Sequence, residues 1–197
     1  MSKLCGLSFI LFAFCGQLLA AIQAPGDGDI GFSEAIGALI QGLVDAEKFE
    51  IHEGLPRTSE TKLFATERKT KTTVQIDGEW FYATLQEGRL EDVSTLKSLF
   101  LGSDLFRPWA GMKLCDGFHA DYAVRFKSDK SIYTVLFCFN CHEARIMRES
   151  RLFQGDIRVP DFRLTTDLDS EKFGQLQTLL LKYRKERSAP LVQPSGS

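Results

Sequence analysis

The sequence predicts an α+β fold, with an antiparallel sheet of about five or six strands and helices packed on one face. Residues 120–126 and 132–138 are two apolar, alternating segments separated by a polar loop, which is typical of a β-hairpin. An Asp-Gly pair at 77–78 marks a second hairpin. Apolar residues recur at helical spacing in 34–47 and again after residue 170. Helices that segregate to one face of an antiparallel sheet are a common layering.

The first predicted elements are a helix and a short strand. Ser33 can cap a helix over residues 34–47. The apolar residues of this helix recur every three or four positions: Ile36, Leu39, Ile40, Leu43 and Val44. Phe49 and Ile51 then alternate with polar neighbours, which predicts a strand.

A hairpin and a second helix follow. Residues 72–76 are β-branched and alternating, and residues 80–82 (Trp-Phe-Tyr) come after Asp77-Gly78. Asp-Gly favours the tight turn of such a hairpin because both turn residues need positive φ. A short helix is predicted around residues 93–100, which place Val93, Leu96, Leu99 and Phe100 on one face.

The middle of the chain holds the strongest strand signals. Residues 103–113 are predicted to form an ordered loop, whose Trp109 is an anchor or lines a groove. The loop Ser128-Asp129-Lys130 joins the two strands 120–126 and 132–138. A further strand is predicted over residues 143–148.

The last predicted element is a long helix. Residues 161–169 are polar and are predicted to be irregular, and Asp169 or Ser170 then caps the helix. Its basic last turn, including Lys182, suits the negative end of the helix dipole. Residues 188–197 are rich in Ser and Pro and are predicted to be a disordered tail, so the single domain spans 33–187.

The N-terminus has the features of a signal peptide. Lys3 precedes an almost wholly apolar run, and small residues follow before Pro25, which predicts a signal over residues 1–24 and a flexible leader over 25–32. We therefore expect export to the periplasm or the exterior. If cleavage fails, residues 4–22 come close to the roughly 20 residues that span a bilayer. Contact with a membrane is predicted only through this uncleaved segment.

Composition excludes several classes of protein. The 197 residues are 44% hydrophobic and 25% charged, which suits a globular domain. The net charge of −2 predicts no nucleic-acid partner. A phosphate-binding Gly-rich loop, Gly-x-Ser-x-Gly and His-Glu-x-x-His are all absent from the sequence. No catalytic residue is predicted, and a non-enzymatic function is favoured.

The chemically unusual residues cluster at one end of the central hairpin. Removal of the signal leaves three cysteines: Cys115, Cys138 and Cys141. If Lys127 faces Ser131, Cys138 lies opposite Ala120. Opposed residues share a face, so this register puts Cys138 on the apolar face of Tyr122, Val124 and Phe126. His119 and His142 begin strands at the same end of the sheet.

Several interpretations of this cluster are open. Cys115 can form a disulfide with Cys138 or Cys141, or the latter two can pair with each other. Alternatively, Cys115, His119, Cys138 and Cys141 form a tetrahedral zinc site. The pattern Cys138-Phe139-Asn140-Cys141-His142 also matches c-type haem attachment, although it joins two strands here instead of opening a helix.

In two further interpretations, the cluster has either no chemical role or a catalytic one. The cysteines can be incidental core residues, with the histidines hydrogen-bonded locally. Alternatively, a Cys141 thiolate is a nucleophile with His119 or His142 as its base. Nearby Asp116, Asp121 and Glu143 could serve as acids or bases, although solvated or capping carboxylates are the favoured interpretation.

Residues 114–124 and 136–144 together resemble a group of uncharacterised exported bacterial proteins. The shared features are a Cys-x-x-x-His segment (Cys115, His119), a hairpin, and Cys-Phe-x-Cys at the end of the next strand (Cys138, Cys141). The resemblance covers about residues 49–185 and implies export, without an activity. In the group, the histidine after the second cysteine is variable, which argues against haem.

We therefore predict an exported binding or structural domain whose Cys/His cluster staples one sheet end. A zinc protein or a c-type haem protein is the alternative, and no cofactor is otherwise predicted. The ligand and the partners are unknown from the sequence.

Overall fold

The computed structural model describes residues 30–102, 104–111, 113, 117–128, 131–151 and 158–187. Within them lie four helices and nine strands, and the α+β prediction is confirmed. The helices are α1 (Phe32–Val44), α2 (Thr61–Thr70), α3 (Leu90–Leu101) and α4 (Ser170–Leu181). The strands are β1 (Phe49–Glu53), β2 (Thr73–Ile76), β3 (Glu79–Tyr82), β4 (Gln86–Glu87), β5 (Phe106–Pro108), β6 (Tyr122–Ser128), β7 (Ser131–Cys138), β8 (Glu143–Arg151) and β9 (Arg158–Leu168).

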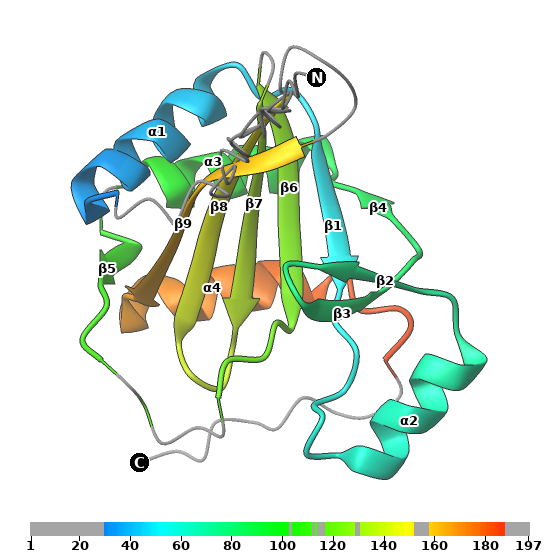
Figure 1. Cartoon of the computed structure of the whole chain (residues 1–197). Helices are drawn as coiled ribbons and strands as arrows, with labels where there is room; N and C mark the ends of the chain where they lie inside the picture. Colours follow the sequence, from blue (N-terminus) through cyan, green and yellow to red (C-terminus); the bar gives the residue numbers. More distant parts are fainter. Residues whose placement is uncertain are drawn as a thin grey trace, which may run out of the picture.

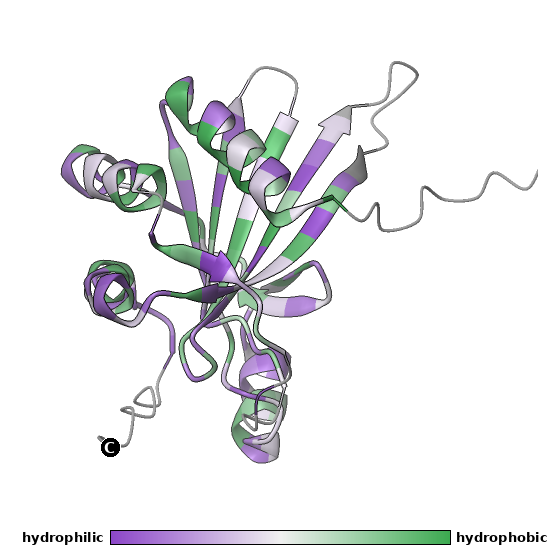
Figure 2. Cartoon of the chain, turned by 90° about the vertical axis from the view of Figure 1, so that its left-hand side faces the viewer, coloured by the Kyte–Doolittle hydropathy of each residue, from purple (hydrophilic) through white to green (hydrophobic). Residues whose placement is uncertain are grey.

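Seven of the strands form one antiparallel sheet in the order β4-β1-β6-β7-β8-β9-β5. Helices α1, α3 and α4 cover one side of it, which we call the helix face (Figures 1 and 2). Alternate residues of the strands point into this layer and are buried, among them Ile51, Val124, Val135 and Ile146. This main core holds α1 and α4 onto the sheet through apolar burial.

The β2–β3 hairpin lies on the opposite side, which we call the hairpin face (Figure 1). Asp77 and Gly78 both have positive φ, so the predicted Asp-Gly turn is confirmed. A second, smaller core lies beneath the hairpin: Phe81, Ala120, Ala123, Leu136 and Met147. Asp77 and Glu79 form ion pairs with Arg163 of β9 and Arg145 of β8, so the hairpin is tied to strands well beyond its neighbour β1.

Helix α2 follows β1 and was not predicted. It has only two large apolar residues, Leu63 and Phe64, and both are half-buried. The helix packs on the hairpin with the Arg68 guanidinium 4.1 Å from the Trp80 ring centroid. Two half-buried apolar residues leave too weak an apolar pattern for the helix to be recognised from sequence.

Two other expectations for the second half of the chain are wrong. Residues 161–169, expected to be irregular, lie in the eleven-residue strand β9 and at its end. Their alternation is real, with Phe162 and Leu168 buried on the helix face and polar residues on the other. The expected loop 103–113 contains β5, which pairs with β9 at the sheet edge.

The predicted register of the central hairpin is also wrong, by one residue. Ser128 pairs with Ser131 and Tyr122 with Phe137, whereas the prediction paired Lys127 with Ser131. A one-residue shift moves a whole strand's side chains to the other face. Cys138 therefore lies on the hairpin face with Leu136, and not with Tyr122, Val124 and Phe126.

The helix at the end of the domain is confirmed, but it ends at Leu181, so the expected basic last turn is wrong: Lys182 is the C-cap residue and the other basic residues follow the helix. The Asp169 carboxylate caps α4 by accepting hydrogen bonds from the backbone N–H groups of Glu171 and Lys172, at 3.1 and 3.3 Å. At the other end, α1 begins at Phe32, inside the predicted leader, so Ser33 lies in its first turn. The predicted signal peptide and tail lie outside the described residues. None of the helices in the described part of the chain is long and apolar enough to cross a membrane.

Candidate functional site

The two described cysteines of the cluster lie where β7 ends and turns into β8. Cys138 is the last residue of β7, with no exposed surface, and Cys141 in the turn is 3% exposed. His142 has a φ of 52°, which lets the chain reverse direction into β8. Cys115 lies outside the described residues.

Cys138 is a free thiol enclosed by hydrogen-bond donors. Its Sγ atom is 3.8 Å from an Arg57 guanidinium nitrogen and accepts from the backbone N–H groups of His119 and Cys141. Burial nevertheless raises the pKa of this thiol above its usual value. Cys138 is therefore a protonated, solvent-inaccessible group at neutral pH, which is unsuitable for a nucleophile.

Cys141 is held against the loop that precedes β6. Its Sγ atom lies 3.4 Å from the carbonyl oxygen of Gly117, and its own carbonyl accepts a hydrogen bond of 2.8 Å from the Lys113 ammonium group. No two cysteine sulfurs are at bonding distance within the described residues. Gly117 is, however, only two positions after Cys115, so this contact brings the chain next to Cys115 up to the Cys141 sulfur.

His119 is packed into the same end of the sheet. Its side chain is 13% exposed, and its Nε2 atom lies 3.9 Å from Asp121 Oδ1. Burial lowers its pKa to about 4, although the Asp121 charge acts in the opposite direction. The imidazole is therefore neutral at pH 7.

Beside the cysteines lies a buried ionic network that sequence reasoning missed. Arg187 Nη1 donates to Asp121 Oδ1 at 2.9 Å, and the backbone N–H of Phe139 donates to Asp121 Oδ2 at 2.8 Å. Both ionic side chains are at most 4% exposed. The expected acid–base candidate Asp121 thus has a structural partner on each carboxylate oxygen.

Glu53 extends this network to the residues after α4. Its carboxylate accepts three hydrogen bonds of 2.7–2.9 Å from the backbone N–H groups of Lys185, Glu186 and Arg187. The sequence held one signal for it, because Glu53 continues the inward alternation of Phe49 and Ile51. An acid at an inward position requires hydrogen-bond donors.

The Cys-x-x-Cys-His segment does not suit c-type haem attachment. Cys138 is fully buried on the hairpin face. The His142 ring instead stacks on Phe173 of α4, on the helix face, with ring centroids 4.1 Å apart. The thiol and the imidazole that one haem would need therefore lie on different sides of the sheet.

The structure describes three of the four ligands that the zinc interpretation requires, because Cys115 lies outside the described residues. His119 and Cys138 are neighbours, since the His119 N–H contacts the Cys138 sulfur. The described residues contain no group of three or more side chains that could hold a metal ion. The set Cys115, His119, Cys138 and Cys141 therefore stays a prediction.

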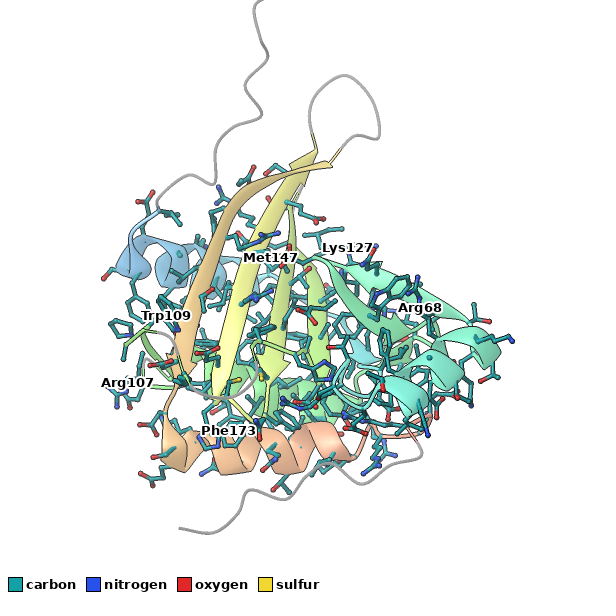
Figure 3. The ribbon with its side chains drawn as sticks, turned by 60° about the horizontal axis from the view of Figure 1, so that its bottom comes forward. Arg68, Arg107, Trp109, Lys127, Met147 and Phe173 are labelled. Carbon is teal, nitrogen blue, oxygen red and sulfur yellow. The ribbon has the colours of Figure 1, made fainter. Side chains whose placement is uncertain are left out.

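A small pocket of about 180 Å³ lies next to the Cys141 turn. Trp109 lines it with 48% of its surface exposed, directly after the edge strand β5 (Figure 3). The indole N–H donates to the buried carboxylate of Glu143 at 3.1 Å, and the Arg145 guanidinium stacks 3.9 Å from the Phe118 ring centroid. Lys113 and Gly117, which precede and follow Cys115 in the sequence, complete the wall on the cysteine side.

Of the other two acids that sequence analysis singled out, Glu143 lines this pocket, and Asp116 lies outside the described residues.

No protein-family model, curated protein or solved structure matches this chain.

Proposed function

We propose that the protein is an exported, non-enzymatic binding domain in which a Cys115–Cys141 disulfide staples the loop before β6 to one end of the sheet. The observation that carries the proposal is the 3.4 Å contact of Cys141 Sγ with the Gly117 carbonyl. The apolar N-terminal run supports export, and an oxidising compartment allows the disulfide to persist.

The environments of the two described cysteines favour Cys141 as the bonded one. Cys138 is enclosed between Arg57 and two backbone N–H groups on the hairpin face. Cys141 is in the turn, beside residues that flank Cys115 in the sequence. This pairing leaves the odd thiol where solvent and oxidants do not reach it.

The disulfide has a stabilising role and a positioning role. Closing the loop between Cys115 and Cys141 stabilises the fold by about 3–4 kcal/mol in the chain-entropy estimate. It also fixes Lys113 and Gly117, which form one wall of the Trp109 pocket. The pocket lining combines Lys113 and Arg145 with Glu143, so it suits a small polar ligand more than a strongly charged one.

Peptide mapping without reduction tests the pairing. We expect one disulfide that links the Cys115 and Cys141 peptides, with Cys138 alkylated only after unfolding. The Cys138→Ala variant should keep the bond, whereas Cys141→Ala should lose it and become more sensitive to heat. A bond to Cys138, or three thiols that react in the native protein, contradicts the proposal. One equivalent of zinc retained after purification would replace the staple by the four-ligand metal site.

A further inference from the structure

Charge is unevenly distributed over this chain. We call residues 57–71 and 184–187 the basic patch; it contains eight of the 24 Lys and Arg residues but three of the 26 Asp and Glu residues. The patch has a net charge of +5, and the rest of the chain has −7. The overall charge of −2 therefore conceals a strongly positive end of the molecule.

The two parts of the patch are adjacent in space. The Lys71 ammonium group forms an ion pair of 2.8 Å with Glu186, which joins the end of α2 to the segment after α4. That segment is fixed in turn by its hydrogen bonds to Glu53. The patch is thus built on a rigid support.

The outer surface of the patch is cationic. Five of its side chains are exposed: Lys62, Arg68, Lys69, Lys71 and Lys185. Among the described residues, Lys62, Lys69 and Lys185 have no carboxylate within salt-bridge distance. The only acid within α2 is the buried Glu67, which lies on the inward side of the helix.

The shape of the patch indicates a broad partner. Helix α2 projects from the body of the domain beyond the hairpin (Figures 1 and 3). A projecting helix does not enclose a small anion, which needs convergent donors. Two of its three cations, Lys62 and Lys69, are lysines, and Lys71 follows the helix directly. Lysine attracts negative charge without the bidentate geometry that arginine gives to specific phosphate contacts.

We infer that the basic patch is a docking surface for a membrane rich in anionic phospholipid headgroups. Headgroups present a continuous, planar layer of negative charge, which matches the exposed lysines on and beside the projecting helix. This contact is distinct from the N-terminal apolar segment and from the Trp109 pocket, and it does not depend on the disulfide.

Co-sedimentation of the full chain with vesicles tests this inference. We compare phosphatidylglycerol–phosphatidylcholine vesicles with pure phosphatidylcholine vesicles at low salt. The apolar N-terminal segment contributes equally to the binding of every variant to both kinds of vesicle. The readout is therefore the ratio of the two partition coefficients. Each lysine near an anionic surface contributes about fivefold to binding, so the Lys62→Gln/Lys69→Gln variant should lower the ratio roughly 25-fold.

A matched control removes two exposed lysines elsewhere. Lys48→Gln/Lys127→Gln makes the same change in net charge outside the patch and should lower the ratio less than twofold. Equal losses in the two double variants, or no preference for the anionic vesicles, would overturn the inference. Binding to soluble polyglutamate without binding to the vesicles would also overturn it, because the partner would then be an acidic polypeptide. Unchanged melting temperatures establish that both variants are folded.

Discussion

Replacement of Arg187 by Met should destabilise the domain strongly, although Arg187 lies six residues beyond α4. Met keeps the length and much of the apolar surface of the side chain but removes the guanidinium. Asp121 Oδ1 then loses its 2.9 Å partner, and the carboxylate stays 3% exposed. The Phe139 N–H still binds the other oxygen.

The expected loss is about 3–5 kcal/mol, because removing one member of a buried ion pair leaves an uncompensated charge. For a domain of this size it corresponds to a fall in melting temperature of roughly 6–20 °C. The Lys48–Glu87 pair is the matched control, since its side chains are 75% and 64% exposed. Lys48→Met should change the free energy of unfolding by less than about 1 kcal/mol.

Urea titration followed by far-ultraviolet circular dichroism measures both variants. We expect the Arg187→Met midpoint to fall without a change in slope. The Arg187→Met/Asp121→Asn double variant should lose less than the sum of the two single losses, because the two residues are in contact. An Arg187→Met variant within 1 kcal/mol of the parent protein would refute the assignment of this pair as a structural centre.

Three further outcomes are expected. Gly54→Ala should cost about 1–3 kcal/mol in urea titrations, because its Cβ would collide with the Ala120 carbonyl oxygen, whereas Gly37→Ala in α1 meets nothing within 4 Å and should be neutral or stabilising. The free energy of unfolding should fall as pH decreases from 6.5 to about 4, because His119 has a folded pKa of about 4 and binds its proton more readily in the unfolded chain. The His119→Gln variant should reduce the slope of this pH dependence by at most about 1.4 kcal/mol per pH unit. Maleimide should label Cys138 no faster than the protein unfolds, and rapid labelling of the native protein would contradict its burial.

Local signals in the sequence predicted the elements that depend on local chemistry. The Asp77-Gly78 turn depends on the φ values of its own two residues, and Asp169 accepts a hydrogen bond from a backbone group two positions later, so a few consecutive residues were enough to predict both. The same holds for α3, whose apolar residues recur at helical spacing. The expectation that Cys138 and Cys141 lie at one sheet end also followed from local strand positions.

The register of the central hairpin could not be decided in this way. β7 is buried on both sides from Ile132 to Cys138, because the helix layer covers one face and the hairpin with its small core covers much of the other. Alternation therefore carried no information about which face Cys138 occupies. The partners of the buried acids could not be identified from the sequence either, since Arg187 lies 66 positions from Asp121 and the backbone donors to Glu53 lie 132 to 134 positions away.

The Glu53 contacts have a consequence for the order in which the domain can form. Synthesis proceeds from the N-terminus, so β1 is complete long before the backbone groups of residues 185–187 that bind its carboxylate. Until those residues emerge, the Glu53 carboxylate lacks its three backbone donors and Asp121 Oδ1 lacks Arg187, so a nascent chain can close this end of the sheet only at a high cost in free energy. Contacts of such long sequence separation also form slowly. If the chain is exported as we propose, this delay keeps it unfolded during translocation, and residues 185–187 complete the fold after transport.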